Sequence, residues 1–176
     1  MGKLEVIRSM FGHNEWANNK ILEAASKASA EELSRKSGLS PKGVTDTLAH
    51  ALGTQIFWLG EWKEPGSFSQ SWFQGLDSFE GVREGFGKSH QALAQYLAGL
   101  SDADLERLIT PPEWWGDTPG LRFPLWHIML QVIEHSQQHR SEVAQAISEA
   151  GSSPGELDYI DFAIEANRAE WVAGQR

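Results

Sequence analysis

Two histidines one helical turn apart are the residues whose types and spacing most directly suggest chemistry. His135 and His139 lie in "QVIEHSQQHRSEVAQAI", residues 131–147, where the other regularly spaced residues are apolar. Because an α-helix turns by about 100° per residue, both imidazoles face one side, which we expect to be the apolar stripe. An imidazole buried there needs a partner for each ring nitrogen. Two such nitrogens on adjacent turns can share one metal ion.

His50 is the best candidate for a third ligand. It lies midway along "VTDTLAHALGTQIFWLGEW", residues 44–62, whose apolar residues on two sides predict a buried helix. Three imidazoles from two helices would leave at least one coordination position open, which is typical of catalytic metal sites. A chain with six histidines can also contain such a pair by chance. Two separately hydrogen-bonded core histidines at 135 and 139 are therefore the alternative.

The remaining histidines are weaker candidates for metal binding. His127 lies about 120° from His139 around the same helix, so it points away from the pair. His13 and His90 sit among polar or glycine neighbours, and we expect both to be surface imidazoles.

Carboxylates and tryptophans near these positions could complete a site. Glu61 and Glu134 are the carboxylates nearest the three histidines in sequence, and either could orient a ligand or act as a base. A solvated helix face explains Glu134 equally well. Trp114 and Trp115, adjacent in "TPPEWWGDTPG", could line the mouth of a pocket.

The composition narrows the class of protein and the type of ligand. The net charge is -9 and the 15 Lys and Arg residues form no block, so we expect no nucleic-acid partner. No apolar run approaches the roughly 20 residues that cross a bilayer, and the first residues lack the apolar core of a signal peptide. We therefore expect no membrane partner and a cytoplasmic location. Because there is no cysteine, any metal must be held by nitrogen and oxygen.

The elements that must position these side chains are helices. Apolar residues recur at three- and four-residue steps in four long segments: 3–27, 44–62, 77–98 and 124–150. Ser29 and Glu32 form a capping box that predicts a short helical turn, and residues 156–171 predict a last short helix. A long Pro- and Gly-rich loop with a turn or small hairpin, residues 110–120, precedes the fourth long helix. The sequence predicts one all-α domain spanning residues 1–176.

Four motifs in order resemble the DinB family of four-helix-bundle proteins. The segments "HNEWANNKILEAA", "VTDTLAHALGTQIFWL" and "VIEHSQQHRSEVAQAI" are similar to its W-A-N, second-helix histidine and H-x-x-x-H-R segments. "PGELDYIDF" is similar to the segment that opens its last helix. The resemblance covers nearly the whole chain. It implies an up-down-down-up bundle with a short additional C-terminal helix and a long loop before the fourth long helix.

The resemblance also implies a metal-binding triad formed by His50, His135 and His139. Two departures leave this triad intact but could alter its surroundings. Members often have Gly-Gln or Gly-Glu after the H-R pair, where this chain has Ser141 and Glu142. Many have a histidine one turn before the pair, where this chain has Gln131.

By the same resemblance, the expected function is a metal-dependent transferase or isomerase that acts with a low-molecular-weight thiol, as in bacillithiol S-transferases and mycothiol-dependent maleylpyruvate isomerase. The expected partners are a small-molecule thiol and an electrophilic substrate. The divalent ion is zinc or nickel, with iron, manganese or copper as alternatives. A non-catalytic metal-binding or stress-related bundle protein and a metal-dependent hydrolase are the alternative functions. Because the helix over residues 44–62 is apolar on two sides, we also expect a homodimer.

Overall fold

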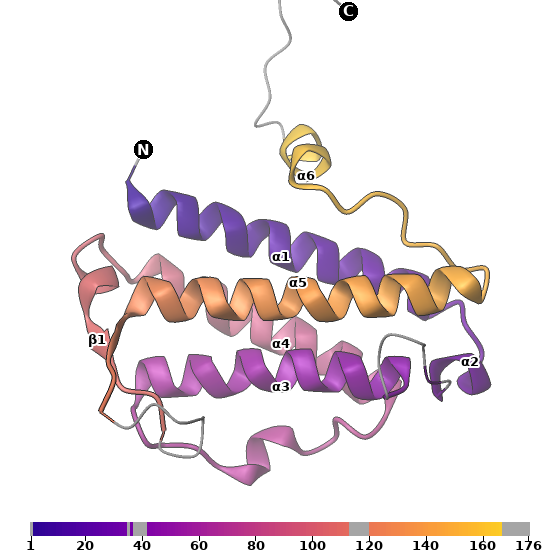
Figure 1. The fold of residues 1–176 in the computed structure, drawn as a ribbon, viewed down its shortest axis with the longest axis horizontal. Coiled ribbons are helices and arrows are strands. Elements are labelled where there is room, and N and C mark those ends of the chain that lie inside the picture. The colour runs from indigo at the N-terminus through magenta and orange to yellow at the C-terminus, as the bar shows by residue number, and fades with distance from the viewer. Residues whose placement is uncertain (1, 35, 37–41, 113–119, 167–176) are drawn as a thin grey trace, which may run out of the picture.

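The computed structural model describes residues 2–34, 36, 42–112 and 120–166. The elements in chain order are α1 (Lys3–Ala25), α2 (Ala30–Ser34), α3 (Val44–Lys63), η1 (Gln70–Phe73), α4 (Phe79–Ala98), η2 (Asp104–Glu106), β1 (Leu108–Ile109), β2 (Phe123–Pro124), α5 (Leu125–Glu149) and α6 (Tyr159–Glu165). In Figure 1, α1 and α5 run in one direction while α3 and α4 run in the other. The predicted all-α, up-down-down-up bundle is confirmed.

Local sequence signals set where the helices begin and end. The Ser29 hydroxyl accepts a hydrogen bond from the Glu32 backbone N–H, and the Glu32 carboxylate accepts one from the Ser29 backbone N–H, which starts α2. Pro124 directly precedes α5, where its missing N–H removes no helical hydrogen bond. Gly151 ends α5 with a φ of 86°, a conformation that L side chains rarely adopt.

The connection between α3 and α4 must return along the bundle, because these two helices are parallel. Residues 64–78, which include η1, make this return, and Phe68, Trp72 and Phe73 pack on one another within it. Two glycines make room for the returning chain and for the helix pair. A β-carbon on Gly60 would overlap the ring of Trp72, and one on Gly85 would lie 2.7 Å from Leu52 Cδ2. Close packing therefore explains Gly85, one of the glycines that lower the helix propensity of α4.

The core consists of two apolar clusters separated by polar side chains. One cluster includes Ile7, Trp62 and Met129, near the end of the bundle where α1 and α5 begin. The other includes Leu52 and Ile147, toward the opposite end. Between them lies a set of buried polar residues that we call the polar layer: Asn14, Asn18, Gln55, Ser89, His90, Ser136 and Arg140. All four long helices contribute to it.

The polar layer ties α5 to α1. The Arg140 guanidinium donates hydrogen bonds to Ser136 Oγ at 2.9 Å, to Asn18 Oδ1 at 3.0 Å and to Asn14 Oδ1. Arg140 is 2% exposed, so these amide and hydroxyl oxygens replace the water that a charged group would otherwise keep. The rotation of α5 against α1 is fixed by these contacts. That rotation also decides where the neighbouring residues His135 and His139 face.

Shorter elements close the two ends and one side of the bundle. β1 pairs with β2 in antiparallel register, Leu108 opposite Pro124, so these two strands flank the loop at residues 110–120 in which the sequence predicted a turn or small hairpin. The tryptophan pair at 114 and 115 lies outside the described residues. The α6 helix lies beside α1, where Glu165 accepts hydrogen bonds from Trp16 and Lys20 (Figure 1). None of the helices in the described residues is both long and apolar enough to cross a membrane.

Candidate metal centre

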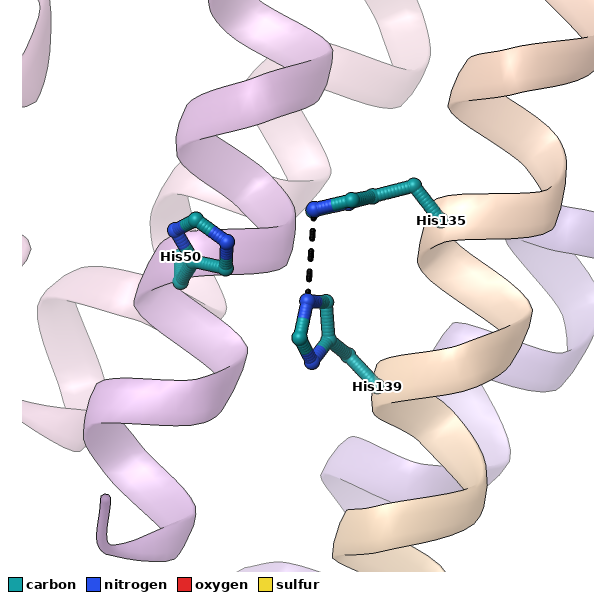
Figure 2. Close-up of side chains that lie close together, drawn as sticks. All are labelled: His50, His135 and His139. Carbon is teal, nitrogen blue, oxygen red and sulfur yellow. Dashed lines mark hydrogen bonds between the residues drawn. The ribbon is translucent and has the colours of Figure 1, made fainter. Parts of the chain in front are cut away.

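The three histidines singled out in the sequence come together on one side of the bundle. His50 comes from α3, and His135 and His139 come from α5 (Figure 2). One ring nitrogen of each residue lies within 4.8 Å of the corresponding nitrogens of the other two. We call this group the histidine triad. Three imidazole nitrogens so close together could hold a divalent metal ion.

The triad is more open than the sequence pattern predicted. We expected His135 and His139 in the apolar stripe and His50 on a buried helix, but His50 is exposed and the other two are half-buried. The interior positions of α5 belong instead to Ser136 and Arg140, each one residue further along the chain. One residue is about 100° of helix rotation, which moves the imidazoles from the core to its edge. The triad can therefore be reached from solvent.

Glu142 fixes the orientation of His139. The Nδ1–H of His139 donates a hydrogen bond to the Glu142 carboxylate at 2.8 Å. This assignment of the proton leaves Nε2 with a free lone pair directed at His135. Metal-binding histidines characteristically make such a bond to a carboxylate. Glu142 was noted in the sequence as a departure from the family pattern, and its spacing three residues after His139 was the signal that could have identified its role.

The two carboxylates proposed from sequence distance lie elsewhere. Glu61 is buried and accepts a hydrogen bond from the Gly66 backbone N–H at 2.9 Å, where it stabilises the end of α3. Glu134 is exposed on α5. Among the described residues, Glu142 is the carboxylate that contacts the triad.

His135 faces His139 and is short of hydrogen-bond partners. Its Nε2 lies 3.3 Å from the Nε2 of His139, and its buried Nδ1 has no hydrogen-bond partner among the described residues. Burial, and then the neighbouring imidazoles, lower the pKa of His135 to about 4. Burial and Lys42 also lower the pKa of His50. Both side chains are therefore neutral at pH 7, the protonation state in which imidazole binds a metal.

The burial of the remaining histidines differs in part from the sequence prediction. The prediction of surface imidazoles at His13 and His90 is wrong, because they are 7% and 4% exposed. His13 Nε2 donates to the Leu157 carbonyl at 2.8 Å, and His90 Nε2 accepts from the Asn18 amide at 3.2 Å. Burial and the charge of Arg140 lower the pKa of His90 to about 4. His127 is exposed and lies apart from the triad, as predicted.

A pocket of about 470 Å³ adjoins the triad. His50 and His135 both line it, so the pocket reaches two of the three candidate ligands directly. Its walls come from α3, from the returning segment that contains Phe68 and Phe73, and from Gln131 of α5. Sequence reasoning missed this pocket, since it depends on how residues 64–78 fold back over α3.

Comparison with known proteins adds one finding. A model of the DinB family matches residues 1–171. No curated protein sequence matches the chain. The family match spans every helix described above and includes all three residues of the triad.

Proposed function

Because the chain belongs to the DinB family, we propose that His50, His135 and His139 bind one divalent metal ion and that the protein is a metal-dependent transferase acting with a low-molecular-weight thiol. The observation that carries the metal site is the convergence of three imidazole nitrogens that lie within 4.8 Å of one another. The ion is zinc or nickel by the chemistry of nitrogen ligands, with iron, manganese or copper as alternatives.

The residues present fit such an ion. The Nδ1–H of His139 is held by Glu142, so the Nε2 lone pair of His139 is free to bind. His135 Nε2 lies 3.3 Å from this nitrogen, a separation at which one metal ion can engage both rings. Without an ion, one of these two nitrogens must carry a proton between them. With an ion, both lone pairs are used.

The open side of the triad supports catalysis over a purely structural role. A divalent ion bound there would lower the pKa of a thiol ligand and make thiolate available at neutral pH. His50 is exposed, and the pocket beside it gives a small molecule access. Because the chain has no cysteine, the thiol must come with a cosubstrate.

Thiol-dependent turnover by the metal-loaded protein tests the proposal. The protein would be loaded with cobalt(II), titrated with a panel of small thiols while the visible spectrum is recorded, and assayed with a model electrophile. We expect the thiols to shift the cobalt bands and the electrophile to be consumed only when a thiol is present. Bands that no thiol perturbs, in a protein that unfolds on chelation, would instead identify a structural ion. Turnover with water alone would identify a hydrolase.

We also propose a homodimer, because members of the DinB family commonly dimerise; the apolar sides of α3 do not argue for it. The second apolar side of α3, which carries Phe57 and Trp58, is buried within the same chain. Phe57 packs there against Phe68 of the returning segment. The α3 helix therefore does not need a partner chain to cover it. Sedimentation velocity at several concentrations would measure the oligomeric state.

A further inference from the structure

The pocket beside the triad is lined mainly by aromatic rings. Phe57 and Phe68 contact edge to face with ring centroids 5.5 Å apart, and Phe68 contacts Phe73 at 5.8 Å. Phe57 in turn packs on Trp58 at 5.1 Å. Rings in contact with one another hold a fixed wall, and such walls favour flat, apolar ligands.

The few polar groups in the pocket offer little to a charged ligand. The Thr54 hydroxyl already donates to the His50 carbonyl at 3.1 Å. Gln131 contributes an uncharged amide. Among the described residues that line the pocket, none is Lys, Arg, Asp or Glu. A carboxylate or phosphate held among these rings would lose its water without gaining a cationic side chain, and the ion that we propose at the triad would be engaged by the reacting atom.

The charges that act on the triad lie on another side of it. Lys42 and Glu142 both line a small hollow together with Val44 and Ala146, whereas neither lines the aromatic pocket. The triad therefore has a charged side and an apolar side. A ligand in the pocket therefore contacts aromatic rings together with His50 and His135.

We propose that this pocket selects an uncharged, ring-bearing substrate, whose apolar part packs among Phe57, Phe68 and Phe73 while its reacting atom reaches the triad. The inference rests on the proposed function, because it names the substrate class of the same site. A volume of about 470 Å³ is within the usual range for small-molecule pockets.

Gly53 provides a way to fill the pocket without replacing a residue of the triad. It lies on α3 and lines the pocket, and a β-carbon there would be 3.4 Å from Phe73 Cε1, an ordinary contact distance. The longer side chain of Gly53→Leu would occupy the space that we assign to the ligand. Gly87→Leu is the matched control, because Gly87 is exposed on α4 with nothing near its β position.

The test compares two thiols that differ by one charge, 4-methylbenzyl mercaptan and 4-(mercaptomethyl)benzoate. Their dissociation constants would be measured by calorimetry in reducing buffer, with metal-free and cobalt-loaded protein. We expect the uncharged thiol to bind more tightly by about tenfold or more. Gly53→Leu should remove most of this affinity and leave the cobalt content unchanged, while Gly87→Leu should change neither.

A surface variant guards against misfolding of Gly53→Leu. In Gln131→Lys, a cation at the exposed rim of the pocket should improve binding of the benzoate. The ratio between the dissociation constants of the two thiols should therefore become smaller. If the wild-type protein bound the benzoate as tightly as the uncharged thiol, or more tightly, the inference would be overturned. Cobalt uptake in the same experiment would leave the proposed function standing. A failure to bind cobalt would contradict the proposed function, and the preference measured in metal-free protein would still decide the inference.

Discussion

Two pairs of polar residues on α5, offset by a single position, have opposite surroundings. Ser136 and Arg140 face α1 and are 3% and 2% exposed, in contact with Asn14 and Asn18. His135 and His139 face α3 and its His50, at the edge of the bundle. Both pairs are spaced by four residues. Because one residue corresponds to about 100° of rotation around the helix, Ser136 and Arg140 face the interior while His135 and His139 face the open site.

The difference separates polar groups that hold the fold from polar groups that could hold a metal ion. In the polar layer, one terminal nitrogen of the Arg140 guanidinium donates to oxygens of three side chains, while its buried Nε, like Nδ1 of His135, has no hydrogen-bond partner among the described residues. In the triad, Nε2 of His135 faces Nε2 of His139, and its Nδ1 has no hydrogen-bond partner in the described part of the chain. A donor matched to several acceptors indicates a structural role, whereas three imidazole nitrogens within 4.8 Å of one another could hold a metal ion. Variants in the two regions should therefore separate stability from metal binding.

Asn18→Leu should have the largest effect on stability. The buried Arg140 guanidinium loses the Asn18 oxygen that accepts its hydrogen bond, and His90 Nε2 loses the Asn18 amide that donates to it. We therefore expect the free energy of unfolding to fall by about 4 kcal/mol. Denaturant unfolding of metal-free protein would measure this. The control is Asn19→Leu, the same change at an exposed position one residue along. If both variants were equally stable, the polar layer would not hold the fold as we describe.

Acid should weaken the fold through His90. Its pKa is lowered to about 4, so below pH 6.5 the unfolded chain takes up a proton that the folded protein refuses. The stability is thus complete above pH 6.5 and declines as the pH falls toward 4, by about 3 kcal/mol for this residue. His90→Gln, which keeps an acceptor for Asn18, should flatten the decline between pH 7 and pH 4 in denaturant unfolding. An unchanged pH profile would contradict this assignment, and His127→Gln controls for an exposed imidazole.

Glu142→Ala should affect metal binding and not stability. The loss of the carboxylate frees the His139 ring to rotate and to change tautomer, so metal affinity should fall by about 10- to 100-fold. Competition with a chromophoric chelator would measure the affinity. Glu134→Ala removes an exposed carboxylate from the same helix and should leave it unchanged. Equal affinities would show that Glu142 does not orient a ligand.

His50→Ala should have the smallest effect on the fold. Since His50 is exposed, the unfolding free energy of metal-free protein should change by less than about 0.5 kcal/mol, as measured with denaturant. A loss of several kcal/mol would mean that the triad, like the polar layer, serves the fold.

Much of the fold could be predicted because helix periodicity is local. The spacing of Leu4, Ile7, Phe11 and Ile21 predicted α1, and the capping box at Ser29 predicted α2. The polar layer could not be predicted in the same way, since two of the partners of Arg140, Asn14 and Asn18, lie more than 120 residues away. A signal was nevertheless present. Asn14 and Asn18 continue the apolar spacing of α1 and so occupy core positions.

The sequence predicted which histidines come together, but not how exposed they are. His135 and His139 could be paired from their spacing, His50 was the best third candidate from its place on a buried helix, and the family resemblance implied the same three residues. Their exposure could not be inferred, because it depends on the rotation of α5 that Arg140 sets. The burial of His13 was missed for a related reason, since its partner is the carbonyl of Leu157, 144 residues away.

The metal content of His135→Ala tests the central claim most directly. Wild-type protein and the variant would be loaded with zinc or nickel, freed of excess ion and measured by mass spectrometry, with His127→Ala as the control on the same helix. We predict about one ion per chain for the wild type and the control, and close to none for His135→Ala with its helical circular dichroism retained. One ion per chain in a folded His135→Ala variant would contradict the assignment of the triad.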